Sequence, residues 1–190
     1  MNIENRLLTP NTFSRPGKRL PFVKGIVIHY TAAPGQRAVN TRGYFESLKN
    51  QNPEADHLVF ASAHFIVDLD GHIIQDLPLD EMAYHCGAQT YKEEAMMRLS
   101  TYPNNCTLGI ELCHKNSSGA FSDDTLTAAA ELAAHLCRQF SLNPETSLWR
   151  HFDVTGKDCP KYFVAHEDKW NQFVALVNEY YKEENDGTER

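Results

Sequence analysis

The sequence lacks long hydrophobic runs and an excess of basic residues, and each absence excludes a class of function. Its apolar stretches are only as long as a strand, so no segment of the 190 residues is predicted to span a membrane. Lysine and arginine total 18 against 25 aspartates and glutamates, which gives a formal net charge of −7. Because non-specific nucleic-acid binding needs basic surface to neutralise phosphates, we expect no nucleic-acid partner.

Internal repeats, low-complexity tracts and a signal peptide are also absent. Residues 1–11 show no basic segment followed by an apolar one, so we expect synthesis in the cytoplasm without a signal peptide. The length fits one ordinary domain with tails, and we expect a monomer. Three prolines predict an extended arm over 1–22, followed by a folded domain over 23–182. The polar residues 183–190 predict a disordered tail or the stub of a linker.

Hydrophobic patterning predicts that strands and helices alternate along the folded domain. A nearly continuous run of β-branched and apolar residues predicts a buried strand over 23–30. Asp70-Gly71 between two apolar runs predicts a hairpin. The other predicted elements are a strand over 107–113 and helices over 38–50, 123–140 (with Ser122 as N-cap) and 166–181. We therefore predict an α/β fold, a single domain in which helices flank a central mixed β-sheet.

Nine histidines and five cysteines supply candidate metal ligands, and an odd number of cysteines cannot all pair in disulfides. His29 stands where the first predicted strand ends, a common position for a ligand held by a rigid scaffold. His151 and Cys159 lie in a predicted loop that could curl back onto one ion. Imidazole and thiolate suit zinc, and three protein ligands would leave a fourth position open for water. From the residues alone, hydrogen-bonded structural histidines and a buried cysteine remain the alternative.

Five segments between residues 23 and 160 form a recognisable pattern. They are Gly25 to Ala32, Ser62 to Asp68 with Gly71, Ala83-Tyr84-His85-Cys86-Gly87-Ala88, Leu108-Gly109-Ile110-Glu111-Leu112, and His151 to Pro160. Their types and order resemble the motifs of the type 2 N-acetylmuramoyl-L-alanine amidases, although the family has Trp where this chain has Tyr84. That family shares its fold with the peptidoglycan recognition proteins. The resemblance therefore implies an amidase type 2 domain over 23–182.

The activity that the resemblance implies is zinc-dependent hydrolysis of peptidoglycan. The bond cut would be the amide between N-acetylmuramic acid and the L-alanine that begins the stem peptide. His29, His151 and Cys159 match the family's zinc ligands. Glu111 matches its acidic residue and Lys157 matches its basic residue.

Elementary chemistry agrees with these implied roles. A thiolate ligand leaves the zinc unit with a charge of about +1, so a nearby base such as Glu111 should help to activate water. Lys157 would stabilise the developing oxyanion as a fixed positive charge. Without the resemblance, Glu111 would be interpreted as a solvent-facing or ion-paired strand residue, and Lys157 as a solvated loop residue.

The resemblance also places two further histidines near the substrate. His85 is predicted to lie in the groove and to contact the stem peptide or the glycan. His64 is predicted to line the site or to support a ligand from behind. For both, the alternative is a histidine whose ring nitrogens bond to the backbone. Among the remaining histidines, His135 is expected in a helix, and the surface is expected to hold His57, His72, His114 and His166.

The four remaining cysteines are predicted to be thiols rather than ligands. Cys113 and Cys137 fall in apolar patterns and are expected to be buried. Cys86 and Cys106 flank the polar segment 88–105, where a disulfide is the alternative. A reducing cytosol argues against that disulfide.

Two other functions compete with the hydrolase. One is a non-catalytic peptidoglycan-binding module on the same fold, and retention of Cys159, Glu111 and Lys157 speaks against it. The other is a structural zinc site, which would need a fourth protein ligand. Within the amidase interpretation, phage or prophage endolysin, autolysin and wall-recycling enzyme all remain open. We favour an endolysin that reaches the cell wall after release or holin-type export.

Overall fold

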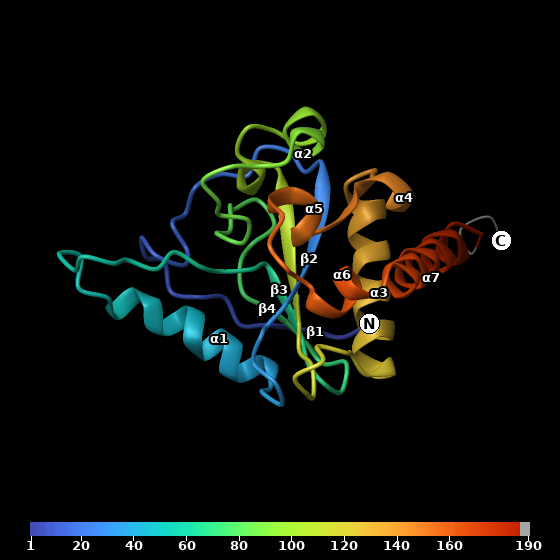
Figure 1. The fold of residues 1–190 in the computed structure, drawn as a ribbon, viewed down its shortest axis with the longest axis horizontal. Helices are drawn as coiled ribbons and strands as arrows, with labels where there is room; N and C mark the ends of the chain where they lie inside the picture. The colour runs from blue at the N-terminus through green and yellow to red at the C-terminus, as the bar shows by residue number, and fades with distance from the viewer. Residues whose placement is uncertain (187–190) are drawn as a thin grey trace.

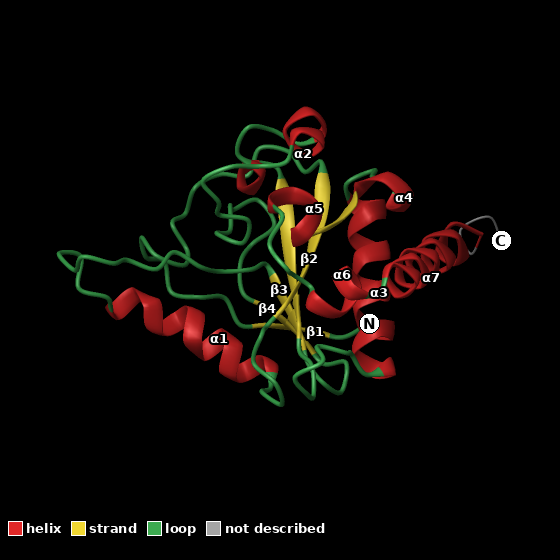
Figure 2. Cartoon of the chain, in the orientation of Figure 1, coloured by secondary structure: helices red, strands yellow, loops and turns green. Residues whose placement is uncertain are grey.

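The protein is built on one mixed sheet with helices on both faces (Figures 1 and 2). The structure is a computed structural model, and it describes residues 1–186. The strands are β1 (Ile3–Asn5), β2 (Gly25–Tyr30), β3 (Phe65–Val67), β4 (Ile73–Gln75), β5 (Thr107–Leu112) and β6 (Leu148–Arg150). Their order in the sheet is β1-β4-β3-β5-β2-β6. Only the β3–β4 pair is antiparallel within the described residues. The α/β fold with a mixed sheet is confirmed.

Seven helices accompany the sheet within residues 1–186. They are α1 (Ala38–Ser47), α2 (Glu93–Arg98), α3 (Asp123–Gln139), α4 (Pro144–Ser147), α5 (His151–Thr155), α6 (Lys161–Ala165) and α7 (Glu167–Asp186). Single 3-10 turns follow α1 (Leu48–Asn50) and precede β5 (Pro103–Asn105). Figure 1 shows α3 and α7 on one side of the sheet and α1 on the other. None of these helices combines the length and apolar character that crossing a membrane requires.

The main hydrophobic core lies between α3, α7 and one face of the sheet. Because strand side chains alternate, Ile26 and Ile28 of β2 point into this core, together with Leu108 and Ile110 of β5. The intervening residues of both strands, His29 among them, face the other side. The second face carries smaller hydrophobic clusters around Ile66 and Val27, and the polar residues of the site lie on it beside them.

Two local predictions from the sequence are confirmed in detail. The Ser122 hydroxyl accepts a hydrogen bond from the Thr125 amide and caps α3 as predicted. The β3–β4 hairpin turns at Gly71, which has a φ of +80°. A Cβ at Gly71 would lie 2.9 Å from the Asp124 carbonyl oxygen, so both the conformation and the space require glycine.

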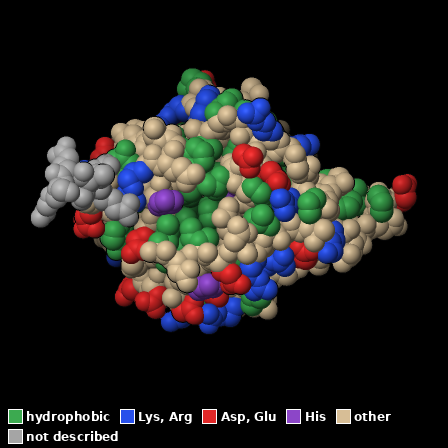
Figure 3. All heavy atoms as spheres, turned by 180° about the vertical axis from the view of Figure 1, so that it is seen from behind, with side chains coloured by type: hydrophobic (Ala, Val, Ile, Leu, Met, Phe, Trp, Pro, Cys, Tyr) green, Lys and Arg blue, Asp and Glu red, His purple; other side chains and the backbone are tan. Residues whose placement is uncertain are grey.

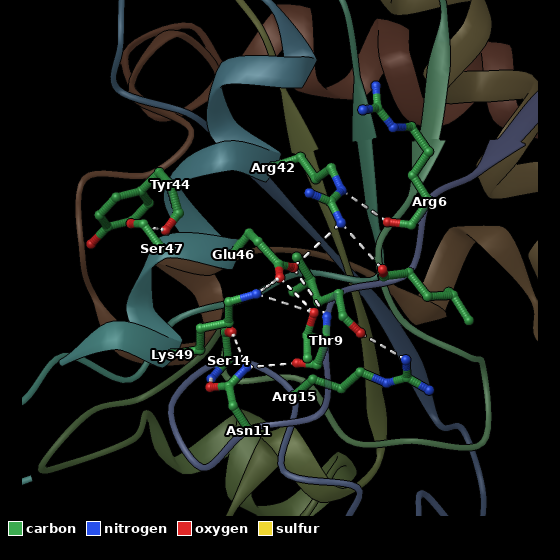
Figure 4. Close-up of polar contacts among 12 residues, drawn as sticks. Arg6, Thr9, Asn11, Ser14, Arg15, Arg42, Tyr44, Glu46, Ser47 and Lys49 are labelled. Atoms are coloured by element: carbon green, nitrogen blue, oxygen red, sulfur yellow. Dashed lines mark hydrogen bonds and ion pairs between the residues drawn. The ribbon is translucent and has the colours of Figure 1, made fainter.

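The first 22 residues pack along the folded domain and place a few side chains in its interior. β1 pairs with β4, and Leu8 is almost fully buried. Figure 4 shows how this segment is tied to α1. The Thr9 amide and hydroxyl donate to the Glu46 carboxylate at 3.0 and 2.6 Å, and Lys49 Nζ donates to it at 2.6 Å. Burial raises the pKa of Glu46, but these hydrogen bonds outweigh it and lower that pKa to about 2.

The predictions for two segments need correction. The stretch from His151 to Cys159 is not all loop, because α5 occupies its first half. Helix α7 continues through Asp186, so the first four residues of the predicted tail are helical. Residues 187–190 of that tail lie outside the described residues. The polar segment 88–105 forms loops around the short helix α2, as its pattern indicates.

Candidate active site

Two histidines and a cysteine that are distant in sequence meet at one edge of the sheet. β2 and β6 are parallel neighbours, so their carboxyl ends lie together and present His29 and His151 side by side. The Nδ1 of His29 lies 3.1 Å from the Nδ1 of His151 and 3.9 Å from the Sγ of Cys159. The three ligand atoms all lie within 4.8 Å of one another, and all three residues are buried. The structure thus brings together the predicted ligands.

Helix α5 and the turn after it bring Cys159 back to His151. Gly156 ends the helix in the left-handed conformation, with a φ of +84°. The amide of Phe152 then donates to the carbonyl oxygen of Cys159 at 2.8 Å, which closes the loop. The eight-residue spacing is therefore one short helix and a tight return.

Arg150, the residue immediately before His151, holds the start of α5 through hydrogen bonds. Its guanidinium donates to both carboxylate oxygens of Asp153 at 2.9 and 2.8 Å, and the Arg150 amide donates to the same carboxylate at 2.9 Å. It also donates to the Phe163 carbonyl oxygen at 3.1 Å. Arg150 is only 8% exposed. A partly buried bidentate pair therefore fixes the first turn of α5, which begins with His151.

The chemistry of this group suits a zinc ion. Burial lowers the pKa of His29 well below its ordinary value and that of His151 to about 4, so both imidazoles are neutral, the form that binds metals. Burial raises the pKa of the Cys159 thiol to about 12, and a bound cation would reverse this shift. Two imidazole nitrogens and one sulfur are a donor set that zinc accepts.

Glu111 lies directly beside this group because β5 pairs with β2 in register. His29 and Glu111 are paired across the two strands. Burial raises the pKa of Glu111 to about 8, and the charge of Lys157 opposes that rise. Its Oε2 is buried without a hydrogen-bond partner, and no salt bridge to it exists among the described residues. A carboxyl group in this state can hold a proton near neutral pH and exchange it.

Lys157 is placed where the sequence predicts, on the return loop between His151 and Cys159. It is exposed and lines the same pocket as Glu111. Its charge acts on the buried site, since it lowers the pKa values of His29, His151 and Glu111. Lys157 therefore provides a positive charge at the rim of the site.

A pocket of about 320 Å³ opens above these residues. The three candidate metal ligands His29, His151 and Cys159 line it, together with the ionisable residues Glu111, Lys157 and Asp158. Four aromatic residues also line it: Tyr44, Phe45, Phe60 and Tyr84. Tyr44 and Phe60 are about half exposed, so aromatic surface is open to a ligand.

The structure separates the two histidines that were predicted to bind substrate. His85 lines the pocket but is only 8% exposed. His64 is fully buried and is not among the residues that line the pocket, so the structure does not place it where a substrate could reach it. The Gly109 amide donates to His64 Nδ1 at 3.0 Å, and His64 Nε2 lies 2.9 Å from the Glu81 carbonyl oxygen. His64 is instead a backbone-bonded histidine, the alternative stated above.

Three other sequence expectations meet the structure here. His114 is buried rather than on the surface; its ring stacks against Tyr30 and its Nδ1 lies 2.8 Å from the Asn116 carbonyl oxygen. All five cysteines are free, which excludes the Cys86–Cys106 disulfide. The sequence analysis does not predict that Cys86 lies beside the site, where its Sγ is 3.1 Å from His85 Nδ1. The only indication in the sequence is that Cys86 directly follows His85.

Comparison with known proteins defines the class first. A solved structure of a mutant endolysin from Bacillus subtilis has the same fold, with a TM-score of 0.67 and 28% sequence identity. The match covers 93% of this chain and 98% of that one. The chain therefore has the fold of this solved endolysin domain.

The family follows from the sequence comparisons. The family model Amidase_2, N-acetylmuramoyl-L-alanine amidase, matches residues 18–162, and the chain belongs to this family. The chain is 34% identical to the N-acetylmuramoyl-L-alanine amidase BlyA of Bacillus subtilis (strain 168), over 91% of this chain and 46% of that protein. It is 37% identical to a probable N-acetylmuramoyl-L-alanine amidase of Bacillus licheniformis, over 94% and 48%. The chain thus spans about half the length of these relatives.

Proposed function

We propose that this chain is a zinc-dependent N-acetylmuramoyl-L-alanine amidase domain. Its substrate would be peptidoglycan, cut between N-acetylmuramic acid and the L-alanine of the stem peptide. The observation that carries the proposal is the convergence of His29, His151 and Cys159 within 4.8 Å in a pocket that Glu111 also lines. The names of the relatives in this family support the same bond.

The protein's own groups supply the remaining chemistry. When bound by the three ligands, zinc would polarise the scissile carbonyl and lower the pKa of a water. Glu111 takes a proton from the attacking water and later delivers it to the amine that leaves with L-alanine. Its buried, unpartnered Oε2 is free for that transfer. Lys157 stabilises the negative charge that develops on the carbonyl oxygen.

A non-catalytic peptidoglycan-binding module is the competing function. Binding alone would not require a carboxyl group whose pKa is raised to about 8 beside three metal ligands. A purely structural zinc site would require a fourth protein ligand close to His29, His151 and Cys159. Within the described residues, the only other ligand group consists of His29, His85 and Cys86, and it does not include Cys159. The fourth ligand is therefore missing from the group that contains Cys159.

The biological role that we propose is that of a phage or prophage endolysin, acting as a monomer on the cell wall after release or holin-type export. The name of the structural relative supports this choice over an autolysin. With a net charge of −7, attraction to an anionic wall must come from the pocket or from another module. On the face in Figure 3, acidic and basic side chains are interspersed rather than gathered into a basic patch.

Digestion of purified peptidoglycan, with and without a chelator, tests this proposal. Mass spectrometry should find free stem peptides with a new L-alanine amine, and the chelator should stop their release. Readdition of zinc should restore it. Products cut at another bond, or digestion unaffected by chelation, would contradict the proposal. Binding to peptidoglycan without any cleavage would favour the non-catalytic module.

A further inference from the structure

His85 lies between His29 and Thr107, with a contact at each of its ring nitrogens. Its Nδ1 lies 3.0 Å from the Nε2 of His29. Its Nε2 lies 3.1 Å from the Thr107 hydroxyl and 3.3 Å from the Thr107 carbonyl oxygen. Gly109 makes room for the ring, because a Cβ there would lie 2.6 Å from the Cγ of His85. Both nitrogens of His85 are therefore engaged by the protein.

The donor and acceptor of each hydrogen bond around His85 can be assigned, because two of the partners are carbonyl oxygens and a carbonyl oxygen can only accept. The Thr107 hydroxyl donates to the Pro103 carbonyl oxygen at 2.7 Å, so its oxygen is left to accept from His85 Nε2. The Thr107 carbonyl oxygen can also only accept from His85 Nε2, so this nitrogen carries a proton. A neutral imidazole carries one proton, and the two acceptors at Nε2 of His85 place that proton there, so Nδ1 of His85 is bare and accepts. Nε2 of His29, 3.0 Å away, is then the donor in this pair, and Nδ1 of His29 is bare.

We propose that His85 is a positioning residue, which holds His29 in the tautomer whose bare Nδ1 faces His151 and Cys159. This inference rests on the metal site proposed above, and it replaces the substrate contact that the sequence predicts for His85. Metal-binding histidines commonly donate from the second ring nitrogen to a fixed acceptor, which orients the ring and increases its basicity. Here the acceptor is another histidine, itself oriented by Thr107.

Cys86 offers a rival arrangement that the same experiment can test. His29, His85 and Cys86 also place three ligand atoms within 4.8 Å of one another. Cys86, however, is fully buried and does not line the pocket, whereas Cys159 does. An ion held by Cys86 would also displace the proton that links His29 to His85. We therefore assign the ion to the Cys159 side.

The test measures zinc affinity by competition with a fluorescent chelator in four variants. H85L should weaken zinc binding by about 10- to 100-fold, the usual cost of losing the partner of a metal-binding histidine. H85Q, whose amide can both accept and donate, should recover part of this loss. T107V should weaken binding in the same direction as H85L. C86S, which changes the residue next to His85, is the matched control and should bind zinc within about twofold of the parent protein.

A spectroscopic readout separates positioning from simple packing. Long-range proton–nitrogen NMR of the metal-free protein should show His29 protonated at Nε2, and in H85L this preference should be lost. Unchanged zinc affinity in H85L and T107V, or His29 protonated at Nδ1, would overturn the inference. A loss in C86S as large as in H85L would place the ion on the rival side instead. If H151A also keeps its zinc, the proposed metal site itself fails rather than the role of His85.

Discussion

His29 and Glu111 stand opposite each other in register on neighbouring parallel strands, so the proposed metal ligand and the proposed proton-transfer group project from the same face of the sheet. Their separation is set by main-chain hydrogen bonding between β2 and β5 rather than by flexible loops. The other residues of the site reach this pair from the segment that follows β6. One rigid edge and one return loop therefore account for the whole constellation.

Removal of the third ligand is the first prediction. Cys159→Ala should lose zinc and peptidoglycan cleavage together, because the two remaining imidazoles cannot hold the ion as tightly. Metal analysis of the purified protein should find about one zinc per chain, against almost none in the variant. Cys137→Ala, a buried cysteine in α3, serves as the control and should keep its zinc. Full activity in Cys159→Ala would contradict the metal site.

The second prediction concerns Glu111. Glu111→Gln preserves size but cannot take up a proton, so turnover should fall by about 10²- to 10⁴-fold. Zinc content should stay unchanged, because Glu111 is not among the three converging ligands. Turnover and zinc content are to be measured on the same preparation. Loss of zinc would instead make Glu111 a ligand or a structural support.

The third prediction uses the close approach of Gly109 to His85. Gly109→Ala would place a Cβ 2.6 Å from the His85 ring, so His85 must move. We expect a loss of about 1–3 kcal/mol in the free energy of unfolding, together with weaker zinc binding. Gly43→Ala, in α1 with nothing within 4 Å of the added Cβ, should instead stabilise by about 0.5–1 kcal/mol. Chemical denaturation of both variants checks the contrast.

Arg150 provides the fourth prediction. Arg150→Met leaves Asp153 without its bidentate partner and also removes the hydrogen bonds of Arg150 to Glu167 and Phe163, so it should destabilise the fold by about 1.5–3 kcal/mol. Zinc affinity should also fall, because His151 begins the helix that this pair holds. Arg6→Lys changes an exposed arginine and should stay within about 0.5 kcal/mol of the parent protein. Equal stability of the two variants in urea would show that the pair contributes nothing.

The fifth prediction is a pH dependence of stability that arises from Glu46. Its pKa is lowered to about 2 in the folded protein, below the ordinary value of 4.5. The stabilisation is therefore complete above about pH 4.5 and is lost as the pH falls towards 2. Glu46→Gln should be less stable than the parent at about pH 7, and the difference should shrink at about pH 3. Urea unfolding at both pH values measures it; an equal difference at both would contradict the assignment.

The elements that the sequence predicts well are those with a strong local pattern. The strand that carries His29 and the helix capped by Ser122 follow from the spacing of apolar residues and from cap chemistry. Helix α5 has only five residues, and its formation depends on the Arg150–Asp153 pair and on contacts with Phe163. Such a helix has too short a pattern to be predicted.

The residues of the site also differ in how well the sequence predicts them. The three proposed ligands follow from recognisable motifs, but the environment of a histidine depends on residues that are distant in sequence. His64 is satisfied by backbone groups at Glu81 and Gly109, and no local pattern near His64 indicates this. The orientation of His85 depends on Thr107 and Pro103, which lie outside its motif. Sequence motifs therefore locate ligands better than they locate the residues that support them.

The pairing of β1 with β4 has a consequence for anyone who shortens this chain. A fragment begun at residue 23 would appear complete by its motifs, yet it would strip the outer strand from the sheet. β4 would then be an exposed edge strand with unpaired main-chain donors and acceptors, which favours strand addition by neighbouring molecules and precipitation. Fusion proteins and truncations should therefore keep Ile3–Asn5 and the buried Leu8 as part of the folding unit.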